Sequence, residues 1–224
     1  MIAPTVRTVT AALLSATTLA CAGTQAVRSS SAPVLTGAAA GLAQAQRDSL
    51  RYPYTEADIR FMSGMISHHA QAIVMASWAP SHGANPSVGR LTERIINAQT
   101  DEISLMQGWL RDRRQQVPEA DPRGMKMTMG GMEHVMAMPG MLTDEQMKEL
   151  DAARGTDFDR LFLTFMIQHH RGAVAMVQDL FSNHGAGQDE TVFKFANDVS
   201  VDQTTEINRM VQMLLELGSS HETR

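Results

Sequence analysis

The chain contains an internal duplication. The segment "MISHHAQAIVM" at 65–75 recurs as "MIQHHRGAVAM" at 166–176, with a constant offset of 101 residues. Further along, the offset settles at 104, where Gln99 and Glu102 match Gln203 and Glu206. The extra residues fall between two matching blocks, so each repeat consists of two segments joined by a loop that tolerates insertion.

Both segments of each repeat are predicted to be helical. Thr55 and Asp58 resemble a capping box, and Thr156 and Asp159 repeat the pattern. Pro80 cannot continue the first helix. The predicted helices cover about 55–79, from 86 onward, 156–182 and 189–217, with a short helix at about 143–153 before the third.

These helices predict an all-α fold, because neither helical hairpin can bury its apolar stripe alone. We expect a ferritin-like four-helix bundle over residues 52–218, built from tandem hairpins at about 55–116 and 143–217. The connecting segment 117–142 is methionine-rich. It exceeds the roughly 2–8 residues that usually join bundle helices, so we expect it to have a function.

The N-terminal residues are predicted to direct export. Residues 1–21 have an early arginine and then a short apolar run, which is typical of a signal peptide. The only cysteine, Cys21, ends this run and predicts a lipoprotein signal; cleavage at Ala20-Cys21-Ala22 is the alternative. Residues 22–51 are expected to form a flexible tether. The protein is therefore expected to be periplasmic or a membrane-anchored lipoprotein of the cell envelope.

Charge and composition disfavour nucleic acid as a partner. The formal net charge is -5 and only 5% of residues are aromatic, whereas nucleic-acid binding requires a basic face or stacking side chains. Methionine is unusually frequent, with 17 residues. These features favour a metal ion as the partner, with membrane contact only through a lipid at Cys21 and the oligomeric state left open.

The doubled histidines are the first candidate metal ligands. A methionine precedes each histidine pair by three residues, so its thioether lies on the same helical face. Docking the repeats is expected to gather four imidazoles and several thioethers: His68, His69, His169, His170, Met65, Met166, Met75 and Met176. The alternative is that the histidines are neutral, hydrogen-bonded core residues.

The ligand types favour a soft metal. Di-iron bundles use Glu-x-x-His, but here Met65 and Met166 stand where that glutamate would be. Thioethers select Cu(I), imidazole suits copper, and Ag(I) is a second soft ion, whereas iron is disfavoured. Glu102 and Glu206 lie on the inward stripes as ligands or as partners of an interhelical hydrogen bond or salt bridge.

The connecting segment holds the second group of candidate ligands. Its sequence "MKMTMGGMEHVMAMPGM" contains Met125, Met127, Met129, Met132, His134, Met136, Met138 and Met141. A flexible chain of thioethers can wrap a monovalent copper ion. The alternative is a hydrophobic flap over the bundle, with methionine as an adaptable filler.

Three segments of the sequence resemble a known family. "FMSGMISHHAQAIVMA", "MPGMLTDEQMKEL" and "DRLFLTFMIQHHRGAVAMV" are similar to the domain-of-unknown-function 305 family of the ferritin-like superfamily, over about 52–217. The resemblance implies a ferritin-like four-helix bundle that is usually exported. It also implies copper binding, since some members are described as periplasmic copper-binding proteins. It supplies no catalytic residues.

The leading hypothesis is an exported binder of Cu(I), and of Ag(I), that sequesters or hands on copper without covalent chemistry. A ferritin-like di-metal oxidase using Glu102, Glu206 and the histidines is one alternative. A metal-free structural or interaction bundle is the other.

Overall fold

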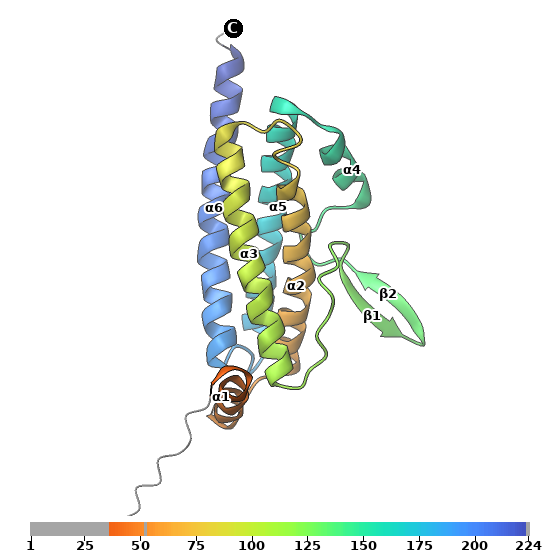
Figure 1. The fold of residues 1–224 in the computed structure, drawn as a ribbon, viewed down its shortest axis with the longest axis vertical. Coiled ribbons are helices and arrows are strands. Elements are labelled where there is room, and N and C mark those ends of the chain that lie inside the picture. Colours follow the sequence, from red (N-terminus) through yellow and green to blue (C-terminus); the bar gives the residue numbers. More distant parts are fainter. Residues whose placement is uncertain (1–35, 52, 223–224) are drawn as a thin grey trace, which may run out of the picture. The chain divides into compact units, whose positions relative to one another are not determined.

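The computed structural model describes residues 36–51 and 53–222, and these are predominantly helical. The helices are α1 (Gly37–Arg51), α2 (Glu56–Ser77), α3 (Pro86–Asp112), α4 (Asp144–Ala152), α5 (Gly155–Ser182) and α6 (Glu190–Glu222). The long helices α2, α3, α5 and α6 run side by side (Figure 1). The prediction of a helical fold is confirmed. The predicted signal segment and Cys21 lie outside the described residues.

Part of the predicted tether is helical instead. Residues 37–51 form α1, which packs beside α3. The sequence "GAAAGLAQAQRDSLR" is rich in alanine, leucine, glutamine and arginine, all of which have high helix propensity. Its low hydrophobicity suggested a tether. The segment is nevertheless helical, because its residues favour helix formation and one side of the helix packs against α3.

The two helical hairpins are tied together through the starts of α2 and α5. Thr55 and Asp58 form the predicted capping box at α2. Asp58 Oδ1 also accepts a hydrogen bond from the backbone N–H of Gly187, at 2.7 Å, in the loop of the other hairpin. This bond fixes the first hairpin against the second.

The predicted capping box at Thr156 is wrong. Helix α5 begins earlier, with Arg154 at its N-cap and no side-chain capping bond. The Asp159 carboxylate instead accepts from the Asn85 backbone N–H at 3.1 Å and from Asn85 Nδ2 at 2.7 Å. This carboxylate therefore joins the second hairpin to the loop of the first, as Asp58 joins the first to the second.

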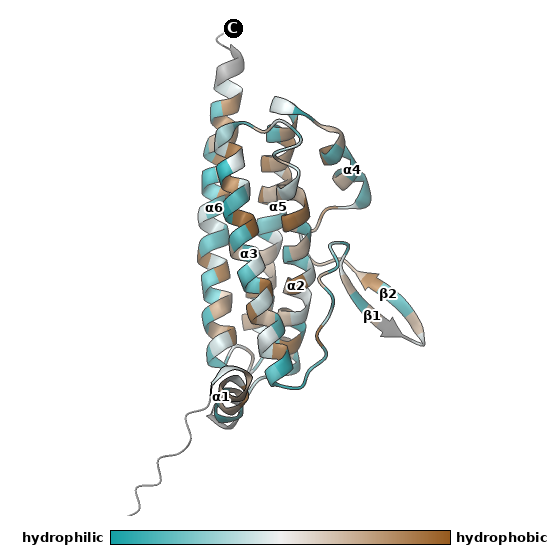
Figure 2. Ribbon diagram, viewed as in Figure 1, coloured by the Kyte–Doolittle hydropathy of each residue, from teal (hydrophilic) through white to brown (hydrophobic). Residues whose placement is uncertain are grey.

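The apolar core is divided into two clusters along the long helices. One contains Phe61, Met106, Val177 and Phe195, and the other contains Leu91, Phe162, Leu163 and Met210. Hydrophobic and hydrophilic residues accordingly alternate along these helices (Figure 2). Between the two clusters, each of the four helices carries polar residues.

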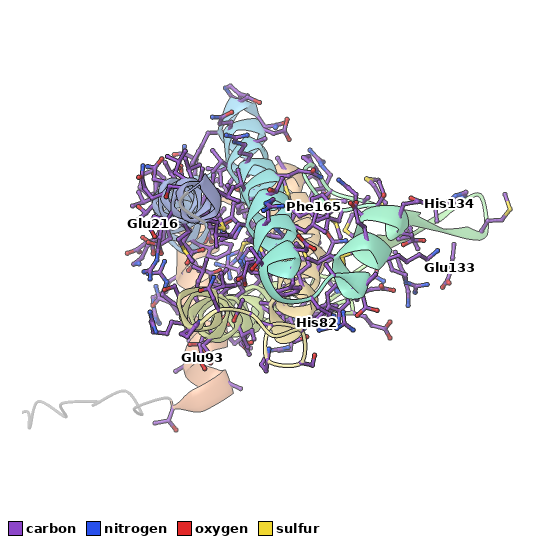
Figure 3. The ribbon with its side chains drawn as sticks, turned by 90° about the horizontal axis from the view of Figure 1, so that it is seen from above. His82, Glu93, Glu133, His134, Phe165 and Glu216 are labelled. Carbon is purple, nitrogen blue, oxygen red and sulfur yellow. The ribbon has the colours of Figure 1, made fainter. Side chains whose placement is uncertain are left out.

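The connecting segment contains a β-hairpin rather than an unstructured chain. Strands β1 (Met125–Met129) and β2 (Met132–Met136) pair antiparallel, with Met125 opposite Met136 and Met127 opposite His134. Gly130 and Gly131, with φ of 61° and 82°, form the two-residue turn that such strands require. The hairpin extends away from the helices, and His134 lies on it (Figure 3). None of the helices over the described residues is both long and apolar enough to span a bilayer.

Candidate metal centre

The four predicted histidines form a continuous row between the two apolar clusters. The ring centroids of His68 and His169 are 3.8 Å apart, which joins α2 to α5. Each ring is 6.3 Å from its sequence neighbour, His69 or His170. All four side chains are fully buried. We refer to these four residues as the histidine row.

Each end of the histidine row is bound to a carboxylate. His69 Nε2 lies 2.7 Å from Glu102 Oε2 on α3, and His170 Nε2 lies 2.6 Å from Glu206 Oε2 on α6. Glu206 Oε1 also accepts from Arg94 Nη2 at 2.8 Å. The carboxylates therefore orient the imidazoles, as carboxylates hydrogen-bonded to metal-binding histidines do.

These hydrogen bonds determine which imidazole nitrogens carry a proton. Pro139 O, which can only accept, lies 3.0 Å from His68 Nε2, so this nitrogen donates. The carboxylates take the same role for His69 and His170. A neutral imidazole protonated at Nε2 has a lone pair at Nδ1, which is the form that binds metals.

The Nδ1 atoms of the histidine row are buried without partners. No described residue hydrogen-bonds to Nδ1 of His68, His69 or His170, and both ring nitrogens of His169 are also unpaired. Buried polar groups without partners are uncommon and destabilising, so they call for a ligand that the protein itself does not provide. Lone pairs of this kind suit a metal cation.

The imidazoles of His68, His169 and His170 are neutral at neutral pH. Burial, reinforced by the nearby His69, lowers the pKa of His68 from 6.5 to about 3. Burial and the neighbouring His68 also lower the pKa of His169. Burial lowers the pKa of His170 despite its hydrogen bond to Glu206. Protons therefore do not compete for the lone pairs of these three residues near pH 7.

Burial raises the pKa of the Glu206 carboxyl, but the hydrogen bonds from His170 and Arg94 and the charge of Arg94 outweigh this effect. Its pKa is therefore lowered, and the carboxylate is ionised at neutral pH.

The methionine-rich segment reaches the histidine row through its "MPGM" portion. Besides accepting from His68, the Pro139 carbonyl packs directly against Gly172 of α5, where any Cβ would overlap it. Met138 Sδ packs on Gly64 of α2. Met141 Sδ accepts from the Met138 backbone N–H at 3.1 Å and closes the turn. The segment therefore packs against both α2 and α5 beside the histidine row.

A methionine-lined pocket lies next to this "MPGM" portion. It has a volume of about 250 Å³ and includes five thioether side chains: Met125, Met127, Met136, Met138 and Met176. The strand register places Met125 and Met127 on the same hairpin face as their partners Met136 and His134, and Met132 also lies on this face. We call this the methionine face; its side chains range from partly buried at Met125 to 65% exposed at Met132.

The predicted methionine ligands of α2 and α5 are also part of the apolar core. Met65 belongs to one core cluster, and Met75 and Met166 to the other. The side chain of Met129 is outside the described set, and His134 is exposed on the hairpin. Among the described residues, no three His, Cys, Asp or Glu side chains are arranged to hold a metal ion. A centre here would therefore need thioethers or movement of the imidazoles.

Sequence analysis missed two features of the site. The Pro139 carbonyl gave no signal, since any residue has a carbonyl. The methionine face did give one: methionines at alternate positions on both sides of Gly130-Gly131 form a hairpin pattern with period two.

The fold and the histidine row define a helical protein with buried imidazoles beside a methionine-lined pocket. The chain belongs to the family described as "Domain of unknown function (DUF305)", whose model matches residues 58–214. A viral relative, an uncharacterized protein of Acanthamoeba polyphaga mimivirus, is 36% identical over 59 residues. That match covers 26% of this chain and 39% of the relative's length.

Solved structures share the fold. A DUF305 protein of Streptomyces coelicolor, described as secreted, is 31% identical with a TM-score of 0.60, over 72% of this chain and 94% of that one. CopM in its Cu(I)-bound form is 28% identical with a TM-score of 0.54, over 71% of this chain and 96% of CopM. CopM has also been crystallised with Cu(II) and with Ag, at 30% and 28% identity over the same shares and with the same TM-score.

Proposed function

We propose that this protein binds Cu(I), with Ag(I) as a second soft ion, and sequesters or hands on copper in the cell envelope. The observation that carries the proposal is the set of buried imidazole nitrogens without partners beside a methionine-lined pocket. Neutral imidazole and thioether are the ligand types that suit copper and select its monovalent state.

The linkage between pocket and histidine row supports one connected binding region. Met138 lines the pocket, and the next residue, Pro139, hydrogen-bonds to His68. Neighbouring residues of the chain therefore contact the pocket, where thioethers would hold the ion, and the imidazole of His68. The exposed end of the methionine face would supply the route by which the ion enters.

The relatives support the choice of metal. CopM has been crystallised with Cu(I), Cu(II) and Ag, and it shares the helical fold of this chain. The secreted DUF305 relative from Streptomyces coelicolor agrees with the predicted export signal in residues 1–21.

An anaerobic Cu(I) titration against a competing chelator tests the proposal. The variant His68→Ala/His169→Ala removes the central ring pair of the histidine row, and His184→Ala is the control because His184 is exposed in the loop that follows α5. We expect wild type and the control to bind Cu(I) more tightly than micromolar. We expect the double variant to lose at least about tenfold in affinity.

Micromolar or weaker binding by the wild type would overturn the proposal. Equal affinity in wild type and double variant would remove the histidine row from the site. Circular dichroism confirms that each variant is folded, so that a loss of binding is not a loss of structure.

A further inference from the structure

The β-hairpin has an open hydrogen-bonding edge on its outer strand, β2. Among the described residues, β2 (Met132–Met136) pairs only with β1, and all five of its residues are exposed. The hairpin extends away from the long helices, which leaves this edge accessible (Figure 1). A strand edge of this kind presents backbone N–H and C=O groups with which another strand can pair. We call it the β2 edge.

The turn of the hairpin determines which backbone groups point outward along the β2 edge. Gly130 and Gly131 both have positive φ, as in a type I′ turn, whose two flanking residues form a hydrogen-bonded pair. The flanking residue Met132 therefore directs its backbone groups toward β1. This direction alternates along an antiparallel strand, so the N–H and C=O groups of Glu133 and Val135 point away from β1.

These outward groups allow the β2 edges of two copies to pair with each other. In an antiparallel register centred on His134, Glu133 lies opposite the partner's Val135, and the twofold symmetry repeats this pair. All outward groups of both strands then face one another. A register centred on Glu133 would place two carboxylates in direct opposition, which is unfavourable. One centred on Val135 would leave Glu133 opposite Ala137, outside the strand.

The register centred on His134 also brings metal-binding side chains of both copies together. Side chains directly opposite share one face of a sheet, with Cβ atoms about 4.5–5.5 Å apart. His134 therefore faces the partner's His134, and Met132 faces the partner's Met136. Because Met136 lines the methionine-lined pocket, the second copy adds a thioether beside that pocket. Imidazole and thioether are ligands that suit Cu(I).

Strand pairing alone is too small a contact to hold two copies together. A contact limited to one five-residue edge per chain falls below the roughly 1,200 Å² of a stable interface. The formal net charge of -5 on each chain also opposes association. An ion bound by imidazoles of both copies adds a further link between them, so association should depend on the metal.

We propose that two copies of the chain pair through their β2 edges and share a Cu(I) or Ag(I) ion between their His134 imidazoles. The choice of metal rests on the proposed function. The shared site is distinct from the histidine row, because His134 is exposed on the hairpin whereas the four histidines of the row are buried between helices. It gives the exposed end of the methionine face a second copy of the chain as its partner.

Sedimentation velocity of the full chain, with a chelator and with added Ag(I), tests the proposal. We expect a monomer in the chelator and a dimer with Ag(I). Val135→Pro removes an outward N–H from each copy without removing a bond between β1 and β2. It should weaken the Ag(I) dimer at least about tenfold, because the twofold pairing loses two hydrogen bonds. Val135→Thr keeps this N–H and should retain the dimer, whereas His134→Ala should lose it.

The Ag(I) affinity of each protein, measured by chelator competition, separates this inference from the proposed function. A wild type that binds Ag(I) but stays monomeric would overturn the dimer and leave the proposed function standing. A wild type that neither binds Ag(I) nor dimerises would overturn both. A dimer of wild-type strength in Val135→Pro and His134→Ala would place the contact elsewhere and also overturn the inference. Circular dichroism checks that each variant is folded.

Discussion

Gln71 and Gly172 occupy equivalent positions in the two repeats and hold the connecting segment in different ways. Gln71 Nε2 donates to the carbonyls of Pro122 and Leu142, each at 3.1 Å, while its Oε1 accepts from the Leu142 N–H at 2.7 Å. Gly172 instead leaves room for Pro139 to lie against α5. Because the two repeats differ at this position, the connecting segment packs on one face of an otherwise symmetric bundle.

Gly172→Ala should displace the segment from α5. The added Cβ would overlap the Pro139 carbonyl, so the backbone must move and the hydrogen bond to His68 must weaken. Overpacking of this kind costs about 1–3 kcal/mol of unfolding free energy. We expect this loss in chemical denaturation, together with weaker Cu(I) binding.

Gly89→Ala is the matched control for this substitution. Gly89 also lies within a helix, α3, but a Cβ there would meet nothing within 4 Å. The substitution should stabilise the protein by about 0.5–1 kcal/mol, as is usual for glycine to alanine in a helix. Equal effects of the two substitutions would contradict the close approach at Gly172.

The methionine face should bind copper through sulfur rather than through apolar packing. Met125→Leu/Met127→Leu/Met136→Leu keeps the volume of the pocket lining but removes three thioethers. Each swap should change the unfolding free energy by less than about 1.5 kcal/mol. We expect Cu(I) affinity in the chelator competition assay to fall by at least about tenfold.

Met147→Leu, on α4, is the control because Met147 lies outside the pocket lining. It should leave the affinity unchanged. If the triple variant also retains the wild-type affinity, the methionine face acts only as a hydrophobic flap.

The sequence predicts the helices well because their signals are local. Asn85 caps α3 and Pro86 is its first residue, as the Asn-Pro pair indicates. Thr143 and Gln146 form a capping box at α4, where a short helix was expected. The close approach of the His68 and His169 rings follows less directly, since it also requires the two hairpins to dock along their apolar stripes.

The features that the sequence does not predict depend on contacts between distant residues. Asp159 looked like a local cap, but its carboxylate accepts from Asn85, a residue of the other hairpin. Gln99 and Gln203 are almost fully buried once α3 and α6 pack in the bundle. Their equivalence in the repeats could be read from the sequence, but their burial could not.

The buried histidines should make the metal-free protein sensitive to mild acid. The pKa of His68 is lowered to about 3, and those of His169 and His170 are also lowered, so the unfolded chain binds more protons below its ordinary pKa of 6.5. Above pH 6.5 these histidines are neutral in both the folded and the unfolded chain. As the pH falls below 6.5, protons bind preferentially to the unfolded chain, and the folded protein loses stability. Between pH 6.5 and its folded pKa of about 3, His68 alone lowers the unfolding free energy by about 1.4 kcal/mol per pH unit, and His169 and His170 act in the same direction.

Chemical denaturation in the presence of a chelator at pH 7 and pH 5 measures this loss. His169→Leu removes one buried titrating group, so its stability should depend less steeply on pH than that of the wild type. Unchanged wild-type stability at pH 5 would show that the imidazoles are solvated or already protonated in the folded protein.

Cu(I) should raise the melting temperature if it binds within the folded protein. A ligand at 100 times its dissociation constant stabilises by about 2.7 kcal/mol when it binds only the native state. For a domain of this size, that corresponds to an increase of about 5–10 °C in Tm. An ion held only at the exposed Met132 would give a much smaller shift, because thioethers there are equally accessible in the unfolded chain.

Differential scanning calorimetry under anaerobic conditions therefore distinguishes a folded site from surface binding. The shift should appear in wild type and in His184→Ala, and it should shrink in His68→Ala/His169→Ala. A shift of the same size in all three proteins would exclude the histidine row as part of the site.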